Sequence, residues 1–87
     1  MRARKTPVAD WYMGAEESAV LSADRVIVLS ALATEILRVL DEDEWTGVDA
    51  VSTALVAVFG EPAHGTAEAL ADAALAELAD LRLVELR

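Results

Sequence analysis

The chain has 87 residues, a length that fits one domain with a modest hydrophobic core. Hydrophobic residues make up 55% of it, which argues against intrinsic disorder, and the absence of cysteine excludes disulfides, thiol catalysis and cysteine-ligated metal sites. Sixteen acidic and seven basic side chains give a formal net charge of −9, which disfavours binding to a nucleic-acid backbone. Because no apolar stretch approaches the roughly 20 residues that cross a bilayer, we expect no membrane contact and a cytoplasmic location.

The N-terminal segment differs from the rest of the chain. It contains three of the seven basic residues, Arg2, Arg4 and Lys5, and no apolar signal core follows them. We expect residues 1–9 to be a flexible basic segment in front of one domain at residues 10–87.

Three short strands are expected at the start of this domain. Trp11 and Tyr12 favour a strand at 10–15, and further strands are expected at 18–22 and 25–29. Such short spacing is typical of an antiparallel meander.

The third strand, Arg25–Leu29, follows a turn at Asp24 and leads directly into an amphipathic helix capped by Ser30. A strand that is apolar on both faces and short of neighbours is an aggregation hazard unless something covers it, and a bound peptide would be the simplest cover. The acidic run 41–44 is expected to end the helix. The apolar side of this helix consists of Leu32, Ile36, Val39 and Leu40.

Two more helices are expected in the second half of the chain. Thr46 is the expected cap of the second helix, and Gly60 the residue that ends it. Thr66 is the expected cap of the third helix, about 67–81, and the apolar end of the chain at 83–86 is expected to pack on the domain. The apolar stripe of the second helix consists of Val48, Val51, Leu55, Val58 and Phe59.

The order of these elements predicts a single α+β domain, with a three-stranded antiparallel sheet followed by three helices. The third helix carries alanines and carboxylates on the side away from its apolar arc. The simpler interpretation is a stable surface helix, because alanine is the best helix former. A second interpretation is a surface of small residues that lets another backbone approach closely.

No combination of residues indicates catalysis, so we expect a protein that is not an enzyme and needs no cofactor or metal. The one histidine, His64, is expected in a loop, without the nucleophile and orienting group that catalysis needs. The run 41–44 lacks the alternating spacing and the glycine of a calcium loop.

The segment 47–51 is similar to the phosphopantetheine attachment motif of acyl carrier proteins. Ala50 stands where the motif has its serine, and Ser52 is out of register, so no prosthetic arm could be attached. An acidic, helical carrier-like or scaffolding domain without a prosthetic group is therefore the alternative interpretation.

The whole pattern resembles the PqqD-like proteins, the precursor-recognition elements of ribosomally made, modified peptide pathways. The third strand ends in Leu29-Ser30 and the last helix and its end match the pattern LxxLxxxGLV at Leu75, Leu78 and Leu83-Val84, with Arg82 where the family usually has glycine. The resemblance covers about residues 10–86.

This resemblance implies three antiparallel strands and three helices in a winged helix-turn-helix-like arrangement. It implies a peptide chaperone that binds the leader segment of a precursor peptide as an added strand, by β-augmentation, in a groove between the third strand and the third helix. It also implies delivery of the precursor to a modifying enzyme such as a radical-SAM enzyme, a cyclodehydratase or a leader peptidase.

Transferred by position, the resemblance gives a candidate set of peptide-binding residues. Asp72, Glu77 and Asp80 could attract a basic residue of a leader, although exposed ion pairs contribute only about 1 kcal/mol or less. The strand side consists of Arg25, Val26, Ile27 and Val28, and the helix side of Leu70, Ala73, Ala76, Glu77 and Asp80.

Two further hypotheses remain open at this point. A winged helix could bind DNA, against which the net charge of −9 argues. Alternatively, the apolar third strand could pair with its own copy in a homodimer.

Overall fold

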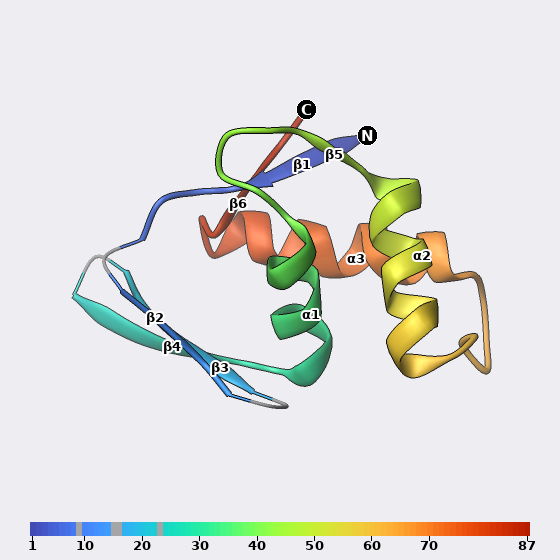
Figure 1. Cartoon of the computed structure of the whole chain (residues 1–87), viewed down its shortest axis with the longest axis horizontal. Coiled ribbons are helices and arrows are strands. Elements are labelled where there is room, and N and C mark those ends of the chain that lie inside the picture. Colours follow the sequence, from blue (N-terminus) through green and yellow to red (C-terminus); the bar gives the residue numbers. More distant parts are fainter. Residues whose placement is uncertain (9, 15–16, 23) are drawn as a thin grey trace.

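The described part of this small α+β protein contains two three-stranded antiparallel sheets and three helices (Figure 1). The computed structural model describes residues 1–8, 10–14, 17–22 and 24–87. One sheet and the three helices form the body of the molecule. The second sheet joins both ends of the chain on one side of it (Figure 1).

The first sheet confirms the expected strands at 18–22 and 25–29 and shortens the first strand, which ends before Gly14. Its order is β2-β3-β4, with antiparallel pairing throughout. Ala15 and Ala23, at the expected end of the first strand and beside the expected turn, lie outside the described residues. The strands are β2 (Asp10–Met13), β3 (Ser18–Ser22) and β4 (Arg25–Leu29).

The two faces of this sheet differ in burial. The row Trp11–Val20–Ile27 lies on the inner face, where Val20 is completely buried. The next row contains Tyr12 and Val28, whose exposed fractions are 70% and 68%. One apolar face of the sheet therefore packs on the helices, while the other is open to solvent.

Helix α1 (Ala31–Val39) follows β4 directly and is capped as expected. The Ser30 hydroxyl accepts a hydrogen bond from the backbone N–H of Ala33 at 3.2 Å, which satisfies one of the free donors of the first turn. Ile36 is completely buried, so the side of the helix that the sequence marks as apolar faces the core.

Helix α2 (Val48–Phe59) corrects the expected cap. Its N-cap is Gly47, without a side-chain hydrogen bond, because Thr46 pairs with Ala3 in the second sheet. Val58 and Phe59 were expected in the apolar stripe, yet they are 56% and 48% exposed. They belong to the final turn of α2, which lies beside the exposed loop 60–66 (Figure 1).

Helix α3 (Ala67–Asp80) begins at the expected cap, since the Thr66 hydroxyl accepts a hydrogen bond from the N–H of Ala69. It ends in a Schellman motif: Arg82 N–H donates to Ala79 C=O at 2.9 Å, and Leu83 N–H donates to Leu78 C=O at 2.9 Å. Arg82 has φ +63°, a left-handed conformation that glycine adopts at lower cost. This chain therefore holds a non-glycine residue where a helix end usually has glycine.

The second sheet corrects the expectation of a flexible N-terminal segment. Its central strand is β1 (Arg2–Lys5), which pairs with β5 (Thr46–Gly47) on one side and β6 (Val84–Leu86) on the other. Ala3 is completely buried, and Leu83 and Val84 confirm that the apolar C-terminal end packs on the domain. Local composition cannot reveal this strand, because its partners lie more than forty residues away in sequence.

Cation–π contacts hold two arginines, one in β1 and one directly after β6, against a tryptophan. The guanidinium carbon of Arg4 lies 4.6 Å from the Trp45 ring centre, and that of Arg87 lies 5.2 Å from it. Arg4 also forms a salt bridge with Glu85 at 3.2 Å. Such contacts stabilise a strand that has little apolar surface of its own.

Candidate functional site

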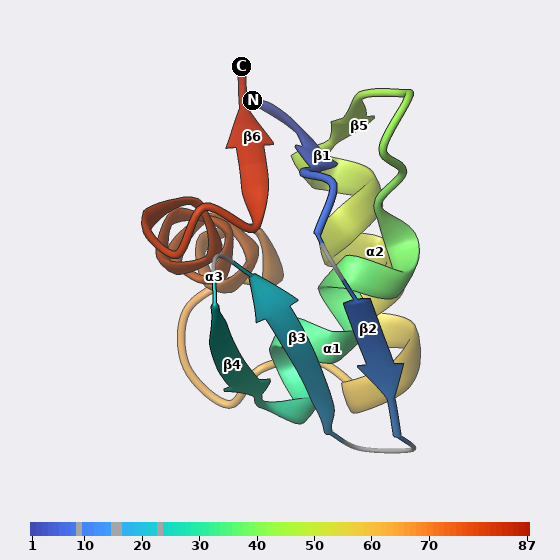
Figure 2. The same cartoon turned by 90° about the vertical axis from the view of Figure 1, so that its left-hand side faces the viewer.

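Strand β4 lies at an edge of its sheet. It pairs with β3 on one side, and no other strand of the described residues pairs with its second side (Figure 2). An edge strand presents a row of backbone N–H and C=O groups that can pair with another chain. The edge therefore has the backbone chemistry needed for strand addition.

The pairing register shows which backbone groups face this open edge. Gly14 N–H donates to Glu17 C=O at 2.8 Å, so these two residues form a hydrogen-bonded pair, and the pairs between β2 and β3 alternate from there. Because of this alternation, the backbone N–H and C=O groups of Val20 point toward β4. Val20 pairs there with Ile27, whose backbone groups therefore point back toward β3. The N–H and C=O groups of the neighbouring Val28, and likewise those of Val26, point to the open side.

A groove of about 420 Å³ separates the end of β4 and the start of α1 from the last turns of α3. Its lining is mostly aliphatic, with two carboxylates from α3. An apolar channel beside an open strand can accept alternate side chains of an extended peptide. The groove is lined by Val28, Leu29, Ser30, Leu32, Ala33, Ala74, Glu77, Leu78, Asp80 and Leu81.

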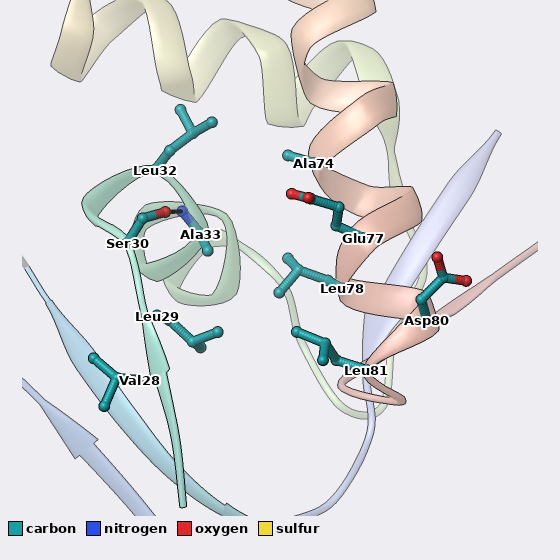
Figure 3. A pocket seen from close by; sticks show the side chains of 10 residues that line it. All are labelled: Val28, Leu29, Ser30, Leu32, Ala33, Ala74, Glu77, Leu78, Asp80 and Leu81. Atoms are coloured by element: carbon teal, nitrogen blue, oxygen red, sulfur yellow. Dashed lines mark hydrogen bonds between the residues drawn. The ribbon is translucent and has the colours of Figure 1, made fainter.

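The side chains around the groove differ in direction (Figure 3). Leu29 points across it toward Leu78 and Leu81, whereas Val28 points to the other face of the sheet. Glu77 points into the groove. Asp80 borders the groove, but its carboxylate points away from β4.

Of the four residues expected on the strand side, Val28 lines the groove. Ile27 is half-buried and packs against the core, while Arg25 and Val26 lie exposed further along the same edge. The expected set reached the groove at Val28 but omitted the next residue, Leu29, which also lines it. Leu29 was recognised in the sequence only as the end of the strand.

Of the five residues expected on the helix side, Glu77 and Asp80 line the groove. Leu70, Ala73 and Ala76 are exposed and do not line it. Apart from Asp80 at its border, the helix side of the groove consists of residues one position further along the chain than most of those expected. These are Ala74, Glu77, Leu78 and Leu81. This set has the spacing i, i+3, i+4, i+7 of a single helix face, a signal that the broad apolar arc of α3 concealed.

The start of α1 contributes Leu32 and Ala33 to the groove. Neither residue was predicted from the sequence to belong to the site. Because Ser30 caps α1 directly after β4, the first turn of this helix must lie beside the end of the strand. A strand that continues into a helix without a loop is the sequence signal that could have placed them there.

The remaining candidate sites gain no support from the geometry. His64 is exposed in the loop between α2 and α3. Within residues 1–8, 10–14, 17–22 and 24–87, no three histidine, aspartate or glutamate side chains gather closely enough to hold a metal ion. None of the helices described here has the length and apolar character required to span a membrane.

Comparison with known proteins adds no relative to this geometry. No family model, no curated protein and no solved structure matches the chain. The open edge of β4, the groove beside it and the resemblance of the sequence to the PqqD-like proteins are therefore the features from which a function can be inferred.

Proposed function

We propose that this protein is a non-catalytic peptide chaperone that binds the leader segment of a ribosomally made precursor peptide and presents it to a modifying enzyme. The leader adds as a strand to the open edge of β4 and places alternate side chains in the groove beside α3. The observation that carries this proposal is the coincidence of a free strand edge with a mostly aliphatic groove beside the end of the same strand.

Backbone hydrogen bonds supply the affinity in this mode of recognition, and side-chain pockets supply the selectivity. Val26 and Val28 offer two N–H and two C=O groups at the edge. A peptide residue opposite Leu29 places its side chain on the inner face, toward Leu78 and Leu81. This division of roles needs no catalytic group in the chaperone.

The same reasoning favours a peptide over DNA as the ligand. In a winged helix-turn-helix-like arrangement, the helices that would approach DNA are α2 and α3. Neither contains lysine or arginine, and α3 carries Glu68, Asp72, Glu77 and Asp80. Such a surface repels phosphates, because binding to nucleic acids depends largely on basic side chains.

A titration with the two halves of a precursor tests this proposal. The probes are synthetic leader and core segments of a candidate precursor, taken from any short reading frame found beside a gene for a modifying enzyme. We expect the leader to bind and the core half not to bind, and hydrogen exchange to show new protection of the Val26 and Val28 amides. Equal binding of both halves, or protection confined to the helices, contradicts strand addition.

Pairing of β4 with a second copy of the chain is the competing use of the same edge. The 70% exposure of Val26 and 68% exposure of Val28 favour such a contact as much as peptide capture. Sizing of the purified protein separates the two: a self-paired dimer dissociates when leader is added, whereas a chaperone is monomeric before the addition.

A further inference from the structure

We infer that the peptide bound in the groove carries a lysine or arginine two residues from an apolar residue, with the cation placed against Glu77. The inference rests on the proposed strand addition to β4 and specifies the ligand that this edge selects. Its starting point is the direction of one carboxylate in an otherwise aliphatic groove.

Glu77 is the charged side chain that points into the groove (Figure 3). Around it lie Ala74, Leu78 and the start of α1, which provide no counter-charge. Asp80, one turn further along α3, borders the same groove but points away from the strand (Figure 3). The two carboxylates therefore differ in what they can contact in a bound peptide.

The chain does not supply a cation to Glu77 in the part that the structure describes. The ion pairs there join Arg4 to Glu85 and Arg38 to Glu35. Arg25 lies at the opposite end of β4 from the groove. With a net charge of −9 overall, the field at the groove favours a positively charged ligand group.

The spacing of the two positions follows from helix and strand geometry. Leu81 lies opposite Leu29, and Glu77 lies nearer to Ser30 (Figure 3). Four residues of helix rise by about 6 Å. Successive side chains on one face of an extended strand are about 6.5–7 Å apart. A peptide residue at the level of Leu81 therefore has its second neighbour at the level of Glu77.

The ion pair is expected to provide selectivity and little affinity. Glu77 is exposed, and exposed ion pairs contribute little because water and salt screen them. We expect about a threefold preference for lysine over glutamine at this peptide position, and a similar step from glutamine to glutamate. Backbone pairing and the apolar residue supply the rest of the binding.

Three labelled synthetic peptides test the inference. Each is an extended serine- and threonine-rich segment with one leucine, and they differ only in carrying lysine, glutamine or glutamate two positions from it. Both orders of leucine and variable residue are made, because a strand can add in either direction. With the wild-type protein, fluorescence anisotropy should rank lysine above glutamine above glutamate in one order. At about 1 M salt, where the Debye length is about 3 Å, this ranking should vanish while binding persists.

Two charge-reversed proteins provide the matched comparison. In Glu77→Lys the ranking should reverse, so that the ratio of affinities for the lysine and glutamate peptides changes by at least about tenfold. Asp80→Lys makes the same change in net charge on the same helix and should leave the order intact. Glu77→Gln should bind the three peptides nearly equally. Circular dichroism of each variant shows that α3 is retained.

The outcomes separate this inference from the proposed function. Equal affinity for the three peptides, with binding that is weakened in Val28→Pro, overturns the basic-residue inference and leaves strand addition standing. A similar change in Glu77→Lys and Asp80→Lys also overturns it, because a general field would then be the cause. If none of the three peptides binds while a synthetic leader does, the basic-residue inference is overturned and strand addition stands. If the leader also fails to bind, the proposed function fails together with the inference.

Discussion

The hydroxyl oxygens of Ser18 and Thr34 lie 2.8 Å apart in the core and form a buried hydrogen bond between β3 and α1. Both residues are almost completely buried, and every buried side-chain polar atom of the described residues has a partner. This bond fixes the sheet relative to α1, which contributes to one side of the groove. The groove therefore has a rigid frame on the strand side.

Removal of one of these two hydroxyls should destabilise the protein. Ser18→Ala or Thr34→Val leaves a buried hydroxyl without a partner, at a cost of about 1–3 kcal/mol in the free energy of unfolding. The double variant should lose less than the sum of the two. Urea unfolding measures all three, with Thr53→Val as the control, since the Thr53 hydroxyl is exposed and should contribute no more than about 0.5 kcal/mol. Strictly additive losses would show that the two hydroxyls do not interact.

Proline at Val28 should weaken peptide binding without unfolding the protein. The Val28 N–H points to the open edge, so proline removes a donor for the peptide and leaves the bonds to β3 intact. Binding of a synthetic leader should weaken by at least about tenfold, the equivalent of one lost hydrogen bond of about 1.4 kcal/mol. Val28→Thr is the control and should bind normally, because its backbone is unchanged.

Proline at the neighbouring Ile27 should instead destabilise the fold. The Ile27 N–H belongs to the ladder with β3, so Ile27→Pro should lower the free energy of unfolding by at least about 1–3 kcal/mol, because a ladder acceptor of β3 loses its donor. Thermal unfolding followed by circular dichroism compares the two variants. Equal destabilisation by proline at both positions would contradict the assigned direction of the backbone groups.

Glycine at Arg82 should stabilise the end of α3. Arg82 has φ +63°, which costs a residue with a side chain about 1 kcal/mol. Arg82→Gly should therefore unfold at a higher temperature than Arg82→Ala, with a difference of about 1 kcal/mol in stability. Both variants lose the same charge, so their comparison isolates the backbone effect. If alanine is the more stable of the two, the Schellman motif does not form in solution.

Deletion of residues 1–5 should destabilise the protein by roughly 2–4 kcal/mol. The deletion removes the central strand of the second sheet, including two hydrogen bonds between Arg2 and Arg87, each worth about 0.5–1.5 kcal/mol. It also removes the completely buried Ala3. Urea unfolding of the shortened chain measures this loss, and Arg2→Gln, a change at an exposed side chain, is the control. A shortened chain of unchanged stability would restore the flexible N-terminal segment expected from composition.

Elements with local signals were predictable from the chain alone. Strand β4 and its continuation into α1 follow from a β-branched run, a change of period and the cap at Ser30, all within a few residues. The three helices and the caps at Ser30 and Thr66 were recovered for the same reason. Composition likewise excluded every site that needs cysteine.

Features that depend on distant pairing could be found only in three dimensions. Strand β1 is a strand because β5 and β6 lie beside it, and Arg4 contacts a partner 81 residues away. Thr46 is part of that pairing, which leaves Gly47 to begin α2. A sequence pattern describes neighbours along the chain and carries little information on neighbours in space.

The groove depends on both kinds of information. The apolar run at 25–29 predicted the strand that borders the groove. On the helix side, most of the predicted residues lie about one position away from those that line the groove. Alanines occur on all sides of α3, so the hydrophobic residues of that helix define a wide arc with no sharp border. Only the packing of Leu75 and Leu78 into the core fixes the rotation of α3 about its axis, and that rotation turns Glu77 toward the open strand.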